Sequence, residues 1–146
     1  MIISPKGIND IKAHEKLMLK AYMPTVNDRP TIGYGRAHGV KMGDTITEAQ
    51  AVALLREDLA WVEACVNKYV TVPMTQNQYD ALCSFVFNLG EANFRSSSML
   101  KYINANKWRE ASKSILQWNK QRTPSGLKVL KGLTIRRQHE SALMLS

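Results

Sequence analysis

Five polar side chains between positions 15 and 38 have the types and spacing best suited to chemistry. They are Glu15, Asp28, Thr31, Arg36 and His38. The sequence contains no G-x-S-x-G turn and no complete phosphate-binding fingerprint, so it does not indicate a serine nucleophile or a nucleotide cofactor. The three histidines lack the spacing of metal ligands, so neither a metal nor a cofactor is expected. The remaining candidate for chemistry is the pair of carboxylates, Glu15 and Asp28.

Glycoside hydrolysis is the reaction that such a pair can perform. It needs one protonated carboxyl as general acid and a second carboxylate to handle water or the charge that develops on the sugar. Glu15 continues an apolar helical stripe with Ile8 and Ile11, and an apolar setting favours the protonated acid. Asp28 follows turn-forming residues and is expected to stay ionised. From spacing alone, a surface or ion-paired role for Glu15 remains the alternative.

The elements that position these residues can be read from local patterns. Ser4-Pro5 is typical of a helix start, and this first helix carries Ile8, Ile11 and Glu15. Alternation then predicts a hairpin or meander with strands near 17–22 and 31–36, joined by the turn formers of 24–30. Gly33 and Gly35 would leave one face of the second strand without side chains, so a ligand or another backbone can approach it.

The rest of the chain is predicted to be helical. The capping boxes Thr47–Gln50 and Thr75–Gln78 open two long helices, the first to about Tyr69 and the second to Gly90. Further helices are predicted near 97–105, 107–118 and 133–144, with a loop at 122–126. Cys65 and Cys83 lie in apolar helical patterns and are expected to be buried thiols. We therefore predict an α+β fold that is mostly α, in a single domain of residues 1–146.

Four collinear segments make the chain recognisable. They are HEKLMLKAY with PTIGYG, then TQNQYDALCSFVFNLG, FRSSSMLKYINANKW and GLKVLKGLTIRRQHESALML. In this order they resemble phage-type lysozymes, the endolysins of glycoside hydrolase family 24. The resemblance covers nearly the whole chain. It implies a small N-terminal β-sheet lobe and a larger helical C-terminal lobe, joined by a long helix.

The resemblance also implies a reaction, the hydrolysis of the β-1,4 bond between N-acetylmuramic acid and N-acetylglucosamine in peptidoglycan. Glu15 matches the family's general acid, and Thr31 matches the threonine that places the attacking water. The family's usual Asp position is Pro24 here, so the second carboxylate role goes to Asp28, the sole Asp between Glu15 and Thr31. A lytic transglycosylase acting on the same bond is the alternative, because it needs the acid but no water-activating Asp.

Substrate contacts are implied for six further residues. Tyr34, Arg36 and His38 belong to or follow the Gly-x-Gly segment, where Arg36 stands in place of the family's His. Asn88 and Gly90 match positions at the substrate, or form an ordinary helix end. Arg136 matches the arginine that packs against the catalytic Glu, or it pairs with Glu140 on a helix surface.

The net charge of +8 lies entirely in residues 101–146. It suggests contact of the basic C-terminal third with an anionic outer membrane or lipopolysaccharide. The alternative class of function is a basic membrane-disrupting or anion-binding protein, but no nucleic-acid-binding signature is found and nucleic acid is not expected. The N-terminal residues do not resemble a signal peptide. With the resemblance to endolysins, this implies an enzyme that accumulates in the host cytoplasm and reaches the periplasm and cell wall through a holin-like pore. A monomer is expected, because the sequence shows no heptad and no exposed apolar stripe.

Overall fold

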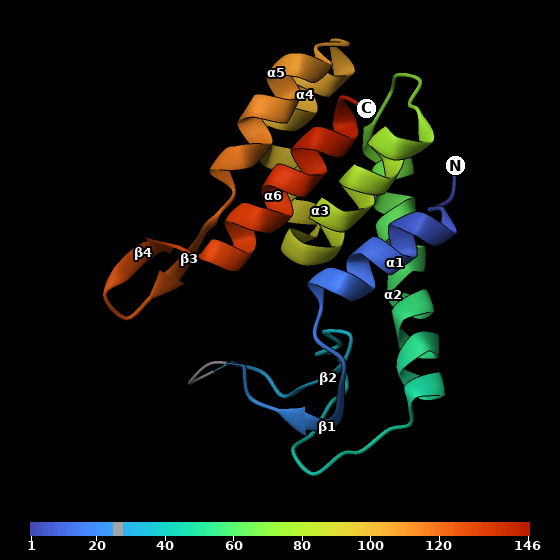
Figure 1. The fold of residues 1–146 in the computed structure, drawn as a ribbon, viewed down its shortest axis with the longest axis vertical. Helices are drawn as coiled ribbons and strands as arrows, with labels where there is room; N and C mark the ends of the chain where they lie inside the picture. Colours follow the sequence, from blue (N-terminus) through green and yellow to red (C-terminus); the bar gives the residue numbers. More distant parts are fainter. Residues whose placement is uncertain (25–27) are drawn as a thin grey trace. The chain divides into compact units, whose positions relative to one another are not determined.

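The computed structural model describes residues 1–24 and 28–146 (Figure 1). The chain divides into two compact units, one of residues 8–61 and one of residues 1–7 with 62–146. Part of the predicted 24–30 turn, residues 25–27, lies outside the described residues. None of the described helices is both long enough and apolar enough to cross a bilayer.

The unit of residues 8–61 contains most of α1 (Pro5–His14), β1 (Met18–Tyr22), β2 (Thr31–Gly33) and the larger, N-terminal part of α2 (Glu48–Tyr69). The predicted cap of α1 is present, because the Gly7 N–H donates to Ser4 Oγ at 3.0 Å. β1 and β2 pair antiparallel, with Tyr22 opposite Thr31. The predicted sheet is therefore confirmed, with shorter strands.

β2 ends at Gly33 and does not continue to residue 36 as predicted. Gly33, the last residue of β2, and Gly35 have φ values of +66° and +87°, so the chain leaves the extended conformation at this point. The chain folds back between them, and Ile32 and Arg36 exchange two backbone hydrogen bonds of 2.8 and 2.9 Å. The two glycines thus form a tight turn, and the expectation of a bare strand face was wrong.

The two predicted capping boxes begin α2 and α3 (Gln76–Ser96). Thr47 Oγ1 accepts from the Gln50 N–H at 3.1 Å, and the Gln50 side chain accepts from the Thr47 N–H at 2.8 Å. Thr75 and Gln78 make the same reciprocal pair. These bonds satisfy backbone donors that the first helical turn leaves unpaired.

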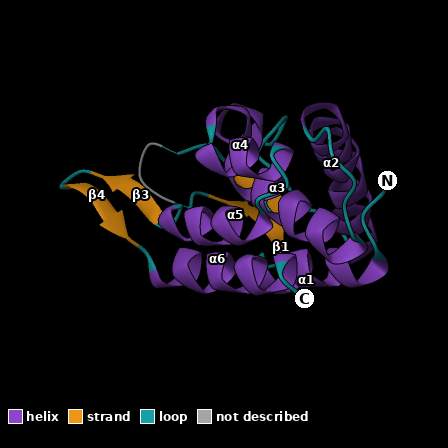
Figure 2. Cartoon of the chain, turned by 90° about the horizontal axis from the view of Figure 1, so that it is seen from above, coloured by secondary structure: helices purple, strands orange, loops and turns teal. Residues whose placement is uncertain are grey.

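The other unit is built around α3, with α4 (Ser98–Asn104), α5 (Trp108–Ser114), the 3-10 turn η1 (Ile115–Gln117) and α6 (Lys131–Met144) packed near it (Figure 2). Its core consists of fully buried side chains from these elements: Tyr79, Phe85, Phe94, Met99, Ile103, Ile115 and Met144. Gly90 interrupts α3 with φ +88°, as expected of a helix end, but the chain returns to helix as far as Ser96.

A second hairpin replaces the loop predicted at 122–126. β3 (Lys120–Thr123) and β4 (Gly126–Val129) pair antiparallel and project from the helices in both views (Figures 1 and 2). Thr123 Oγ1 donates to the Gly126 carbonyl at 2.7 Å across the turn. The sequence did not reveal these strands because nearly all of their side chains are exposed, so no apolar alternation marks them.

Both cysteines are free and buried, as predicted. Burial raises the pKa of the Cys65 thiol to about 11, and it raises the pKa of Cys83 further. Both therefore behave as small apolar side chains in the helical core.

A buried charge cluster joins α6 to α3. The fully buried Glu140 accepts from Ser84 Oγ at 2.5 Å and from Arg137 Nη2 at 3.0 Å. Arg136 Nε lies 3.5 Å from the same carboxylate, and Arg136 Nη2 donates to the Ser84 carbonyl at 3.2 Å. Arg137 also stacks over the Phe85 ring, with its guanidinium carbon 5.2 Å from the centroid. Burial raises the pKa of Glu140, and the two guanidinium groups oppose that rise.

Removing the negative charge at the centre of this cluster should destabilise the fold strongly. We expect Glu140→Gln to lower the free energy of unfolding by about 3–5 kcal/mol, because two buried guanidinium groups lose their counter-charge. The exposed Glu110→Gln is the matched control and should change it by less than about 0.5 kcal/mol. Denaturant unfolding of both variants measures the difference. Equal unfolding midpoints of the two variants would show that the cluster contributes little to stability.

Candidate active site

Glu15 directly follows the last residue of α1. Its N–H donates to the Ile11 carbonyl at 2.9 Å, which extends the helical hydrogen bonding by one residue. Ile11 itself has no exposed surface, so this part of the backbone is anchored in the core of residues 8–61. The Glu15 side chain is half-buried. An anchored backbone holding a partly covered carboxyl is the arrangement that a general acid requires.

The turn after β2 lies directly against this carboxyl group. A Cβ built on Gly35 would be 3.2 Å from Glu15 Oε2 and 3.5 Å from Glu15 Cδ. Together with its φ of +87°, this contact explains why position 35 holds a glycine. The structure therefore brings together the two halves of the first motif, the helix-terminal Glu and the Gly-x-Gly segment.

Thr31 and Asp28 lie on the approach to this turn. Thr31 opens β2, is 8% exposed, and donates from Oγ1 to the Arg29 carbonyl at 3.0 Å. Asp28 lies three residues earlier on exposed backbone, where its Oδ1 accepts from the Arg29 N–H at 2.7 Å. Thr31 is thus fixed by the sheet, while Asp28 is held by a local bond to its neighbour.

Tyr34 and Arg36 flank Gly35, and both are engaged within the same unit. Tyr34 is 9% exposed, and the Lys12 ammonium lies 5.8 Å from its ring centroid. Arg36 Nη1 lies 3.1 Å from Asp58 Oδ1 and 3.7 Å from Glu57 Oε2, both on α2. Burial raises the pKa of Asp58, and the charge of Arg36 opposes this rise. Arg36 therefore ties the turn to α2.

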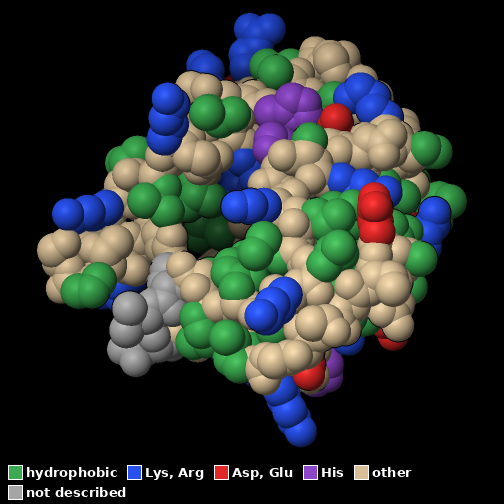
Figure 3. All heavy atoms as spheres, turned by 60° about the horizontal axis from the view of Figure 1, so that its bottom comes forward, with side chains coloured by type: hydrophobic (Ala, Val, Ile, Leu, Met, Phe, Trp, Pro, Cys, Tyr) green, Lys and Arg blue, Asp and Glu red, His purple; other side chains and the backbone are tan. Residues whose placement is uncertain are grey.

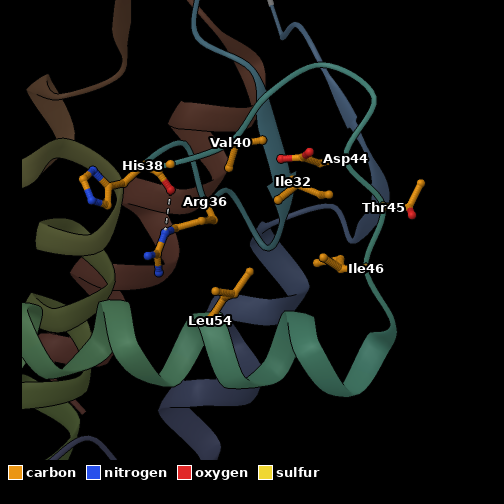
Figure 4. Close-up of a pocket in the computed structure, with 9 residues that line it drawn as sticks. Ile32, Arg36, His38, Val40, Asp44, Thr45, Ile46 and Leu54 are labelled. Atoms are coloured by element: carbon orange, nitrogen blue, oxygen red, sulfur yellow. Dashed lines mark hydrogen bonds between the residues drawn. The ribbon is translucent and has the colours of Figure 1, made fainter.

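Asp58 was not found by the sequence analysis. An acid on the polar side of a long helix is ordinary, and only the fold shows that it faces Arg36. A cavity of about 350 Å³ lies beside this ion pair, with Ile32, Val40, Ile46 and Leu54 on its apolar walls (Figure 4). The His38 carbonyl accepts from Arg36 Nε at 3.2 Å, while the imidazole points away from the cavity.

The remaining three predicted residues lie in the unit built around α3. Asn88 precedes the Gly90 break in α3, and its Oδ1 is covered by protein but accepts no hydrogen bond from the described residues. Arg136 does pair with Glu140 four residues on, but this pair is buried and not on the helix surface. Within residues 1–24 and 28–146, no three His, Cys, Asp or Glu side chains gather as a metal site would require.

Comparison with known proteins gives a consistent result. Residues 12–140 match the phage lysozyme family. The chain belongs to this family. It is 47% identical over 146 residues to the endolysin of Acyrthosiphon pisum secondary endosymbiont phage 1, a match that covers 100% of this chain and 99% of that one.

Two solved structures share the fold of this lysozyme family member. The endolysin from Escherichia coli O157:H7 phage FAHEc1 has a TM-score of 0.92 at 38% identity, covering 100% of this chain and 94% of that one. The muramidase domain of SpmX from Asticaccaulis excentricus has a TM-score of 0.91 at 37% identity, covering 99% and 97%. These findings confirm the predicted family, the α+β, mostly α fold class, and the enzyme class, a peptidoglycan-degrading endolysin.

Two glycines with similar positive φ values test the contact between Gly35 and Glu15. We expect Gly35→Ala to lower the rate of cell-wall clearing roughly 10–100-fold, because the added Cβ displaces the Glu15 carboxyl. Gly39→Ala is the control, since Gly39 has φ +74° and nothing within 4 Å of its Cβ position. Gly39→Ala therefore introduces the same kind of backbone strain as Gly35→Ala but no new contact. Turbidity assays at temperatures where both variants are folded should separate them, and equal rates would contradict the assigned contact.

Proposed function

We propose that residues 1–146 form a single catalytic domain that hydrolyses the β-1,4 bond between N-acetylmuramic acid and N-acetylglucosamine in peptidoglycan. The observation that carries the proposal is the half-buried Glu15 carboxyl, anchored at the end of α1 and packed against the backbone of Gly35. A carboxyl held in this way can deliver its proton to the leaving oxygen without first reorganising.

The proposed mechanism is a single displacement with inversion. Glu15 protonates the glycosidic oxygen as the bond breaks and positive charge develops on the sugar. Asp28 and Thr31 position the attacking water and accept its proton through the Asp28 carboxylate. Thr31 suits a fixed role because the β1–β2 sheet holds its backbone. Asp28 suits the role of base because its side chain is exposed, where water can reach it.

The proposed substrate contacts are Tyr34, Arg36, His38, Asn88, Gly90 and Arg136. Asn88 and Gly90 are included because they match family positions at the substrate, and they lie at the break in α3. We propose that Arg36 acts by holding the turn that carries Gly35, since its guanidinium is paired with Asp58.

The proposed biological setting rests on the resemblance to endolysins and on the charge distribution of the chain. We propose that the protein is a monomer that accumulates in the host cytoplasm and reaches the periplasm through a holin-like pore. Peptidoglycan is its substrate there. The basic C-terminal third, which carries the whole net charge of +8, would contact an anionic outer membrane or lipopolysaccharide.

Product analysis of three variants tests the reaction and its residues. Glu15→Gln should lower the rate about 10²–10⁴-fold, because the amide cannot donate the proton. Asp28→Asn should also lower it, whereas Asp44→Asn, an exposed acid in the same unit, should leave it unchanged. Mass spectrometry of the released muropeptides should find reducing ends. Products ending in 1,6-anhydromuramic acid would replace the proposal with a lytic transglycosylase, and full activity of Glu15→Gln would remove the acid assignment.

A further inference from the structure

The β3–β4 hairpin presents a face of mixed chemistry. In its register, Lys120 lies opposite Val129 and Arg122 lies opposite Leu127. Cross-strand partners point to the same side of a sheet, and so do alternate residues along a strand. These four side chains therefore share one face, which we call the Lys120–Val129 face. Gln121, Thr123 and Lys128 point to the other side.

The apolar members of this face are uncovered. Leu127 is 62% exposed and Val129 is 58% exposed, and every β4 residue is exposed. The hairpin is nevertheless well formed, because Thr123 Oγ1 closes the turn and the Leu130 N–H donates to the Asn119 carbonyl at 3.0 Å at its base. Leu127 near the turn and Val129 near the base contribute nothing to a core, and a partner that covers both would account for them.

The charge of the surrounding sequence indicates the sign of the charge that a partner would carry. Between Glu110 and Glu140 the chain has seven Lys or Arg residues and no Asp or Glu. Four of them, Lys120, Arg122, Lys128 and Lys131, belong to the hairpin or to the residue that begins α6. Figure 3 shows Lys and Arg side chains spread over one face of the molecule. The partner is therefore anionic.

We propose that the Lys120–Val129 face docks on an anionic phospholipid bilayer. Lys120 and Arg122 would contact headgroup phosphates, while Leu127 and Val129 enter the boundary between headgroups and acyl chains. Two aliphatic side chains flanked by cations match a bilayer surface. A polysaccharide or a nucleic acid would be matched by cations with polar or aromatic groups. The inference narrows the proposed contact of the basic third to one hairpin and does not depend on the assigned catalytic residues.

Vesicle binding of matched variants tests the docking face. We expect the full chain to bind vesicles containing phosphatidylglycerol and not vesicles of phosphatidylcholine alone. Arg122→Gln should weaken this binding about fivefold, the usual contribution of one basic residue near an anionic surface. Lys128→Gln removes the same charge from the opposite face and should weaken it less than twofold. Equal effects would overturn the proposal in favour of a diffuse charge effect.

The apolar pair is tested separately. Leu127→Thr with Val129→Thr keeps the preference for a strand but removes the aliphatic surface, and should weaken binding at least tenfold with the same cation count. Leu127→Trp fluorescence, corrected for the native tryptophans, should be quenched by brominated acyl chains, whereas Gln121→Trp should not. Unchanged binding of the Thr pair, or equal quenching at both positions, would overturn insertion.

Activity on isolated, lipid-free cell walls distinguishes this inference from the proposed reaction. All of the hairpin variants should clear such walls at the rate of the parent chain, since none alters Glu15, Asp28 or Thr31. Glu15→Gln should bind the anionic vesicles normally while failing to clear walls. Loss of wall clearing in the hairpin variants would show that the face acts on the substrate and not on lipid.

Discussion

The buried carboxylate of Glu140 is the constraint on which the helical unit depends. Two guanidinium groups and a hydroxyl converge on one carboxylate that has no exposed surface, so each member is tolerated only while the others are present. Ser84 belongs to α3 and the charged residues belong to α6. The cluster therefore fixes the distance between these two helices and their relative rotation. A hydrophobic contact alone would permit more sliding.

The smaller unit is organised by a backbone constraint instead of a charge. Two glycines with positive φ, Gly33 at the end of β2 and Gly35, reverse the chain and place the backbone of Gly35 against the Glu15 carboxyl. Arg36, one residue beyond, ties the same turn to α2 through Asp58. The acid group, the turn and the helix therefore form a single connected arrangement, although β1 lies between α1 and β2 in the sequence.

The helices were predictable because their signals are local. The two capping boxes begin α2 and α3 where the sequence places them, and the positive φ of Gly90 interrupts α3 at the predicted residue. The β3–β4 hairpin was missed because strands that bury nothing have no apolar period to detect. The residues of the first motif could be named from the resemblance, but the side chains that they contact could not be predicted. That Arg36 faces Asp58, and that the Arg136–Glu140 pair is buried and not solvated, depends on tertiary packing that no local pattern encodes.

The inert thiols have a consequence for where such a chain can work. Cys65 and Cys83 are both buried, and the raised pKa of each leaves almost no thiolate at neutral pH to attack a disulfide or a peroxide. The two cysteines are not joined by a disulfide, so neither thiol makes the stability of the fold depend on the redox potential of its surroundings, and folding requires no disulfide isomerase.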